Sequence, residues 1–185
     1  MKNGIMGLLS VLSVMLFVAG CADKKPVKLS EQAEEADMMT DSTVYGVCGD
    51  GTAMHTLQVV TDAGDTLSYL LNNDGKIVSE VQGGLMAGDR VAVVGTMIEG
   101  ERIAQKVINL TTLLGKWTSI DKSFSIEEGG TIQSFVKAES RPWTTWKILN
   151  GQLLLNKDTF SINSLGADSL YLENAVGIFV YKRQK

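Results

Sequence analysis

From Thr43 onward the 185-residue chain consists of short apolar runs separated by turn-forming residues, and no stretch has the apolar spacing of a long helix. Some runs alternate apolar and polar positions, as in HTLQVVT, where Leu57 and Val59 would share one face of a strand. Gly, Asn and Asp interrupt the runs, whereas only Pro142 of the two prolines lies in this part. The pattern predicts an all-β protein made of small antiparallel barrels or sandwiches.

The first 20 residues predict a lipoprotein signal peptide. The segment MKNGIMGLLSVLSVMLFVAGC has one Lys near its start and then an apolar stretch, residues 5–18, that is shorter than the roughly 20 residues of a membrane-spanning helix. It ends in Val-Ala-Gly-Cys, which resembles the bacterial lipobox, and this resemblance implies that Cys21 carries the lipid. Several acyl chains of the palmitate kind would anchor the protein stably to a membrane. The alternative is a plain secretory signal with an incidental Cys.

Residues 21–42 predict the lipid anchor and a flexible tether. The segment is charged and lacks aromatic residues, so it buries too little apolar surface to offset its ordering entropy. The residues after the anchor, Ala-Asp-Lys-Lys, lack the acidic run that resembles a surface-export signal in some Gram-negative lipoproteins. We therefore expect a lipid-anchored protein of the bacterial outer membrane that faces the periplasm, with surface exposure left open.

The charge of the chain argues against nucleic acid as a partner. The chain has 17 basic and 21 acidic residues. Removal of residues 1–20 takes away Lys2, which leaves 16 − 21 = −5, and such a balance gives no basic footprint for nucleic acid. With Cys21 used by the anchor, Cys48 has no partner in the chain. Its apolar surroundings in VYGVCG favour a buried core residue over a reactive or intermolecular thiol.

Residues 43–112 are expected to form the first barrel. The segment LMAGDRVAVVGTMIEGERIAQKVINL resembles the closing strands of an OB-fold, including the small periplasmic kind. The resemblance is carried by Gly88, Asp89, Val91, Val93, Gly95 and the strand that ends at residues 107–110. OB-folds often bind oligonucleotides or sugars through basic and aromatic residues. Because Tyr45 and Tyr69 are the only aromatic residues between positions 43 and 110, we expect a structural or partner-binding module.

Residues 113–185 are expected to form a second barrel, an eight-strand meander. About eight short strands are joined by links of mostly two to five residues, which permit antiparallel neighbours and forbid parallel crossovers. Eight such strands can close on themselves. Alternation predicts one inward face, made of Trp146, Ile148, Leu153, Leu155, Phe160, Ile162, Leu170, Leu172, Ile178 and Val180.

The second barrel resembles the compact lipocalin-like domains of bacterial lipoproteins. Gly115-x-Trp117 on the first strand looks like the lipocalin signature, and Arg183 lies where that family places an arginine against the tryptophan. The resemblance implies a barrel that holds a ligand. Strands of about six residues span only about 20 Å, so the barrel is just wide enough to be filled by its own side chains or to hold one small ligand.

The aromatic residues of this half have two interpretations. The favoured one places Trp117, Phe124, Phe135, Trp143, Trp146 and Phe160 in a core. The best candidates for ligand binding are Arg141, Trp143 and Trp146 in the segment SRPWTTW, where a guanidinium and aromatic rings could meet an anionic or apolar ligand at the barrel mouth.

No motif for catalysis, metal binding or a cofactor is found. His55 is the only histidine, and no nucleophile elbow, metal-spaced Cys/His set or phosphate loop occurs. We expect a non-enzymatic protein without a cofactor that binds a small apolar or amphiphilic ligand in or at the mouth of the second barrel. The alternative is an interaction protein with filled barrels that docks another envelope protein or a glycan. A hydrolase, with carboxylates brought together from distant strands, is the weaker third hypothesis.

Overall fold

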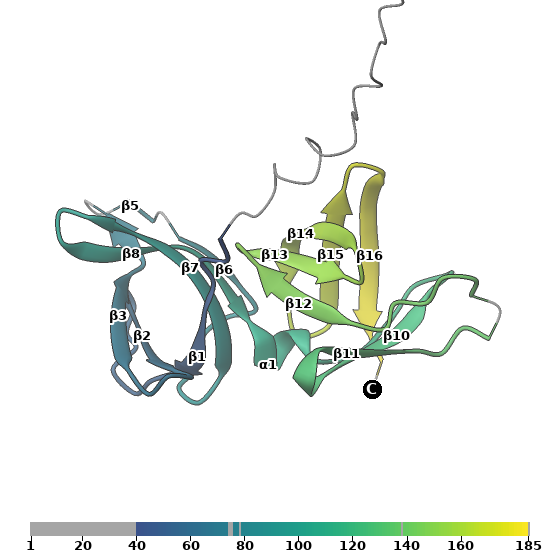
Figure 1. The fold of residues 1–185 in the computed structure, drawn as a ribbon, viewed down its shortest axis with the longest axis horizontal. Helices are drawn as coiled ribbons and strands as arrows, with labels where there is room; N and C mark the ends of the chain where they lie inside the picture. Colours follow the sequence, from purple (N-terminus) through teal and green to yellow (C-terminus); the bar gives the residue numbers. More distant parts are fainter. Residues whose placement is uncertain (1–39, 74–75, 78, 138, 185) are drawn as a thin grey trace, which may run out of the picture. The chain divides into compact units, whose positions relative to one another are not determined.

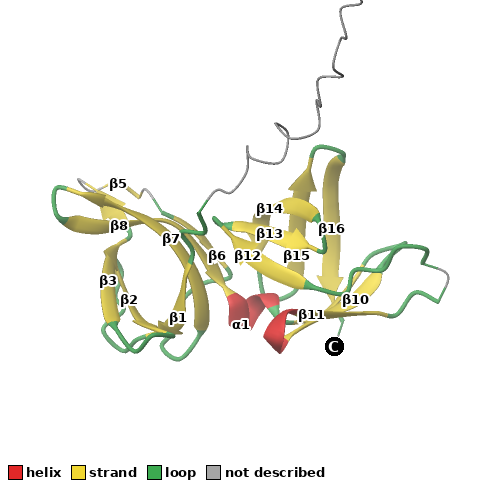
Figure 2. Cartoon of the chain, in the orientation of Figure 1, coloured by secondary structure: helices red, strands yellow, loops and turns green. Residues whose placement is uncertain are grey.

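The computed structural model describes residues 40–73, 76–77, 79–137 and 139–184, so the predicted signal peptide, the predicted lipid-attachment residue Cys21 and nearly all of the predicted tether lie outside the described residues. Residues Thr40–Lys185 form one compact unit that contains two β-barrels (Figure 1). Strands dominate, and Figure 2 shows in red the helical turns between them. The prediction of an all-β fold with two small antiparallel barrels is confirmed, and parallel pairs occur in addition in the sheet of the first barrel.

The first barrel is closed and has five strands in the order β3-β2-β1-β7-β8. All neighbours are antiparallel except the closing pair, in which β3 meets β8 in parallel at Leu70 and Ile103. Strand β6 adds to β8 in parallel, and β4 and β5 form a separate two-strand pair. The bounds are β1 Val44–Cys48, β2 Thr56–Thr61, β3 Thr66–Leu70, β4 Asn72–Asn73, β5 Lys76–Ile77, β6 Glu80–Gln82, β7 Arg90–Ile98 and β8 Glu101–Asn109.

Alternation explains the core of the first barrel. Leu57 and Val59 on β2 are fully buried, as the pattern of HTLQVVT predicts, and they pack with Val91 and Val93 on β7. Cys48 is buried in the same cluster, and its Sγ lies 3.2 Å from Oγ1 of Thr52. The prediction that Cys48 is a core residue is therefore confirmed.

The second barrel is an eight-strand antiparallel meander that is nearly closed, in the order β11-β10-β9-β16-β15-β14-β13-β12. Its two end strands, β11 and β12, meet through the bridge Thr131–Thr145 and the hydrogen bond from Ile132 N–H to Thr144 O (2.9 Å). The bounds are β9 Gly115–Thr118, β10 Ser123–Glu127, the 3-10 turn η1 Glu128–Gly130, β11 Thr131–Ser134, β12 Trp146–Leu149, β13 Gln152–Leu155, β14 Asp158–Leu165, β15 Ser169–Asn174 and β16 Gly177–Arg183.

The inward face of the second barrel matches the prediction as far as β15 and departs from it on β16. The predicted inward residues from Ile148 to Leu172 are buried, and Trp146 is half-buried. On β16, however, Ile178 and Val180 are 61% and 44% exposed, whereas Tyr181 is buried and Phe179 half-buried. The prediction for Ile178 and Val180 is wrong because the larger aromatic side chains on the opposite face of this strand fill the barrel.

Aromatic rings fill one part of the barrel interior. Phe124 makes edge-to-face contacts with Trp143 (5.2 Å between ring centroids) and with Tyr181 (5.1 Å). Phe160 makes the same kind of contact with Trp143 (5.7 Å) and Phe179 (5.8 Å). This arrangement suits the quadrupoles of the rings and adds about 0.5–1.5 kcal/mol per pair beyond burial.

A single helical turn, α1 (Leu110–Leu113), joins the barrels directly after β8. Its N-cap is Asn109, whose Oδ1 accepts from Thr112 N–H at 2.9 Å and whose Nδ2 donates to Asp89 Oδ2 at 2.7 Å. Asn109 is 1% exposed, so these bonds form in a site shielded from water. The first barrel therefore holds the start of the connection between the two halves.

Side-chain hydrogen bonds link the two halves directly. Tyr45 on β1 donates its hydroxyl to Ile148 O on β12 at 2.5 Å. The buried Gln82 on β6 accepts a hydrogen bond from Leu165 N–H at 2.9 Å. Asn150, in the turn after β12, accepts from Ser42 N–H at 2.9 Å. Because these contacts are spread over several strands, they support the packing of residues 40–185 as one unit.

Candidate functional site

Gly115, Trp117 and Arg183 meet at one end of the second barrel. Arg183 pairs with Trp117 across the β9–β16 ladder, and its Cζ lies 4.2 Å from the centroid of the Trp117 ring. A Cβ on Gly115 would lie 2.4 Å from Nη1 of Arg183, and the backbone φ there is +124°. Glycine is thus required twice at position 115, for the left-handed backbone and for the guanidinium that occupies the space above it.

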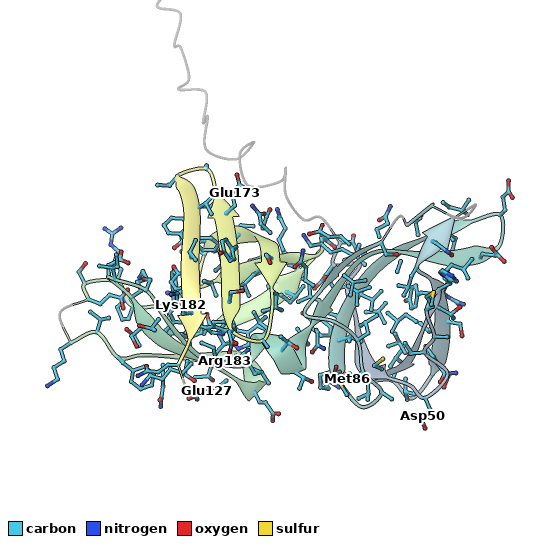
Figure 3. The ribbon with its side chains drawn as sticks, turned by 180° about the vertical axis from the view of Figure 1, so that it is seen from behind. Asp50, Met86, Glu127, Glu173, Lys182 and Arg183 are labelled. Carbon is cyan, nitrogen blue, oxygen red and sulfur yellow. The ribbon has the colours of Figure 1, made fainter. Side chains whose placement is uncertain are left out.

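Trp117 and Arg183 together satisfy the carbonyls at the end of α1. Trp117 Nε1 donates to Leu113 O at 2.9 Å, Arg183 Nη1 donates to Leu114 O at 2.7 Å, and Arg183 Nη2 donates to Thr112 O. The last carbonyls of a helix have no partner within it. Figure 3 shows Arg183 beside Lys182 toward one end of β16. Burial lowers the pKa of Arg183, and the nearby Asp168 opposes this effect.

The structure does not gather the three predicted ligand-binding residues. Trp143 is 8% exposed and belongs to the aromatic core. Trp146, the first residue of β12, is half-buried, and its Nε1 donates at 2.7 Å to the carbonyl of Glu127, the last residue of β10, beside the seam between β11 and β12. Arg141 is exposed in the loop before β12. Of the three, only Trp146 borders a pocket that we describe as the seam pocket below.

An ion pair covers the outer side of Trp143. Lys122 Nζ lies 4.1 Å from the Trp143 ring centroid and contacts the carboxylate of Glu139. Ser134 Oγ donates to the same carboxylate at 2.6 Å. Burial raises the pKa of Glu139, but the hydrogen bonds from Lys122 and Ser134 outweigh burial and hold it below its ordinary value. Trp143 is therefore enclosed on several sides and serves packing.

The seam pocket has a volume of about 440 Å³ and lies where the first barrel, α1 and the β11–β12 seam meet. Its lining residues are Tyr45, Arg90, Leu110, Leu114, Glu128, Gly129, Gly130, Trp146 and Lys147. The hydroxyl of Tyr45 and the indole N–H of Trp146 both donate to backbone carbonyls. Because their polar atoms are already bonded, these two side chains offer the pocket mainly aromatic surface.

Charged groups of both signs lie at the seam pocket. Asp62 binds the Arg90 guanidinium through two hydrogen bonds, of 2.5 and 3.0 Å, and this contact lowers the pKa of the Asp62 carboxyl. Glu128 and Lys147 add one charge of each sign. The pocket thus combines an apolar wall with a charged border and little net charge. Small-molecule sites in proteins commonly have an apolar lining with a few polar or charged groups.

Sequence reasoning missed most of the seam pocket because its residues come from distant segments. Tyr45 stood out only as one of two aromatic residues in the first half, and Arg90 and Leu114 gave no signal of their own.

The exposed His55 lies with Nδ1 2.8 Å from Nδ2 of Asn72. In the part of the chain that the structure describes, no three His, Cys, Asp or Glu side chains are placed to hold a metal ion.

No described helix is both long and apolar enough to cross a membrane. Comparisons with protein families, curated proteins and solved structures find no match to this chain.

Proposed function

We propose that this protein is a lipid-anchored, non-enzymatic protein of a bacterial cell envelope that binds a small apolar or amphiphilic molecule in the seam pocket, beside the second barrel. The observation that carries the proposal is the pocket itself. Its volume of about 440 Å³ lies within the usual range for small-molecule sites, about 300–1,000 Å³. Tyr45, Trp146, Leu110 and Leu114 give it the apolar wall that such a ligand needs.

The lipid anchor at Cys21, the outer-membrane location and the periplasmic orientation belong to the same proposal. They rest on the lipobox-like ending of residues 1–20 and on the tether that follows. A binding site held close to a membrane shortens the path that a poorly soluble molecule must travel through water.

The lipocalin-like and OB-like assignments also remain proposals. The contact of Trp117 with Arg183 supports the first. The strand order β3-β2-β1-β7-β8, closed by the parallel pair Leu70–Ile103, supports a five-stranded barrel of the OB kind.

One observation favours a second function, that of a protein-docking or glycan-docking module with filled barrels. Trp143, Phe124 and Phe160 pack edge to face inside the second barrel, so side chains occupy the space that a lipocalin would give to its ligand. In that case the loops and strand edges, rather than the seam pocket, would contact the partner.

The test uses residues 22–185 without the anchor, exported to a bacterial periplasm and purified without detergent. Native mass spectrometry followed by solvent extraction looks for a stoichiometric small molecule, and titration with dodecanoate probes the emptied protein. We expect the bound molecule and the dodecanoate response to be lost on Trp146→Ala. They should persist on Phe135→Ala, a matched aromatic deletion at a 46% exposed residue that does not line the pocket. A clean protein mass without a dodecanoate response would favour the docking function instead.

A further inference from the structure

Strand β16 presents an open edge along its first five residues. On one side β16 pairs with β15 over its length, from Gly177–Asn174 to Lys182–Ser169, without a register shift. On the other side β9 pairs only with Lys182 and Arg183. Among the described residues no strand pairs with residues 177–181 on that side. The wall of the second barrel is thus incomplete at this point.

Backbone directions identify the groups that the open edge leaves unpaired. Arg183 N–H donates to Asp168 O, on the β15 side, at 2.9 Å, whereas Gln184 N–H donates to Lys116 O on β9 at 2.8 Å. Successive residues of a strand direct their N–H and C=O groups to opposite neighbours. Ile178 and Val180 lie an even number of residues before Gln184. Their backbone groups therefore point away from β15, into the open side.

The side chains at this edge are apolar and exposed. Ile178, Val180 and Val176 are 61%, 44% and 87% exposed, and Ile120 in the neighbouring β9–β10 turn is fully exposed. No charged residue or proline occurs at positions 177–181. Edge strands that must stay unpaired usually carry a lysine, a proline or a bulge. This edge has none of these between Gly177 and Tyr181, so it is suited to receive another strand.

The open edge borders a notch of about 520 Å³. Residues Ile178–Lys182 line one side of the notch, and residues Thr118–Asp121, at the end of β9, line the other. Figure 3 places Glu173 near the turn that joins β15 to β16 and Lys182 toward the opposite end, so the edge runs between these two labels.

We propose that the occupant of this edge is a second copy of the chain, whose β16 pairs antiparallel with the first around a two-fold axis at Phe179. In this register Ile178 of each copy faces Val180 of the other, and every free position from 177 to 181 meets a free position. Any other register would place a free residue of one copy opposite Lys182, which β9 already covers, or opposite the β15–β16 turn. Each Ile178–Val180 pair would exchange two backbone hydrogen bonds.

The ends and the charges of the edge fit the same partner. The strand of the second copy must end opposite Tyr181, because Thr118 already pairs with Lys182. In the proposed register the residue opposite Tyr181 is Gly177, which is the first residue of β16 and directly follows a turn. This arrangement brings the exposed Val176 of one copy toward the exposed Ile120 of the other. Because residues 177–181 are uncharged, self-pairing brings no like charges together. The contact is isologous and closes as a dimer, although five residues per copy make it small and concentration-dependent.

The test traps the dimer through cysteines in the full chain, in intact bacterial membranes. The variant Ile178→Cys with Val180→Cys places thiols on facing residues, whose Cα atoms lie about 5.5 Å apart in a hydrogen-bonded pair, within disulfide range. Tyr171→Cys with Glu173→Cys is the matched control, because these residues are the β15 partners of Val180 and Ile178 and have the same spacing. After mild oxidation we expect a covalent dimer from the first variant and none from the control or the parent chain.

Equal trapping by both variants, or none by either, would overturn the proposal. A disulfide to a different protein would also overturn it and would assign the edge to an extended segment of that partner. A second measurement uses the chain without added cysteines and follows its association by sedimentation at several concentrations. Val180→Lys should abolish the concentration-dependent association, whereas Tyr171→Lys should leave it intact. If both lysine variants associate like the parent, the edge is not the interface.

Discussion

The guanidinium of Arg183 lies 4.2 Å from the ring centroid of Trp117, while both side chains donate hydrogen bonds to the carbonyls that end α1. The contact therefore has two roles. It closes the ladder between β9 and β16, and it fixes the second barrel to the segment that leads from the first.

The first prediction concerns this contact. Arg183→Met and Trp117→Phe should each destabilise the fold, and the double variant should lose less than the sum, with a coupling energy of about 1 kcal/mol or more, because both single changes remove part of one interaction. Urea unfolding of the four proteins, followed by tryptophan fluorescence, measures the coupling. Lys182→Met, at the exposed neighbouring position, is the control and should change stability by less than about 0.5 kcal/mol. Strictly additive losses would show that Arg183 and Trp117 act independently.

The second prediction concerns Gly115. Gly115→Ala should cost about 2–4 kcal/mol, because the new Cβ meets the Arg183 guanidinium and the backbone φ is positive. Gly64→Ala is the matched control, since φ is +93° there and nothing lies within 4 Å of the added Cβ. It should lose only the backbone contribution, about 1 kcal/mol. Urea unfolding measures the loss of unfolding free energy in each variant. Equal losses in the two variants would show that contact with Arg183 adds no steric cost.

The third prediction concerns the buried Gln82 between the barrels. Gln82→Met keeps the volume but leaves the Leu165 N–H without its acceptor, which should cost about 1–3 kcal/mol. Hydrogen exchange should then accelerate at the Leu165 amide more than at amides in the first-barrel core. Gln105→Met, at an exposed position of β8, should leave both stability and exchange unchanged. Unchanged exchange at Leu165 in the Gln82 variant would contradict the proposed link.

The fourth prediction concerns pH. The pKa of Glu139 is held below its ordinary value of 4.5 because hydrogen bonds from Lys122 and Ser134 outweigh the effect of burial. A carboxyl with a lowered folded pKa adds stability above its unfolded pKa and loses it as pH falls through the folded value. The parent chain should therefore lose more stability than Glu139→Gln between about pH 5 and pH 3. Glu101→Gln, at an exposed position of the first barrel, should follow the parent curve. Parallel curves for the parent and the Glu139 variant would contradict the assignment.

The sequence predicts the strands of the second barrel well because their alternation is clear and their links are short. Leu153 and Leu155, or Leu170 and Leu172, leave only one side for the core. Strand β16 is different, since Ile178, Phe179, Val180 and Tyr181 are apolar at every position and alternation cannot choose a face. Packing determines which face turns inward, because the larger rings of Phe179 and Tyr181 fill the interior.

The candidate site was harder to predict because it depends on contacts between distant segments. Trp143 and Trp146 lie three residues apart and look equivalent in SRPWTTW. Their roles differ because Thr145 bridges to Thr131, and β12 then starts at Trp146, whose indole reaches over the seam to Glu127 O. Likewise Tyr45 reaches the seam pocket only because its barrel packs against β12. The spacing of these residues along the chain predicts neither arrangement.

The hydrogen bonds from Arg183 to the end of α1 also have a consequence for how the molecule folds. Arg183 binds the carbonyl of Leu114 from 69 residues further along the chain, and the meander between them consists of hairpins that can form one after another. Local hairpins form quickly, whereas a contact across such a separation must first offset a large loop-closure entropy. During synthesis the first barrel can assemble while the second is still emerging. The hydrogen bonds from Arg183 to the end of α1, however, wait for the last strand. The contacts of Tyr45 and Gln82 with the second barrel can form earlier, so the bonds of Arg183 complete a junction that is already partly made.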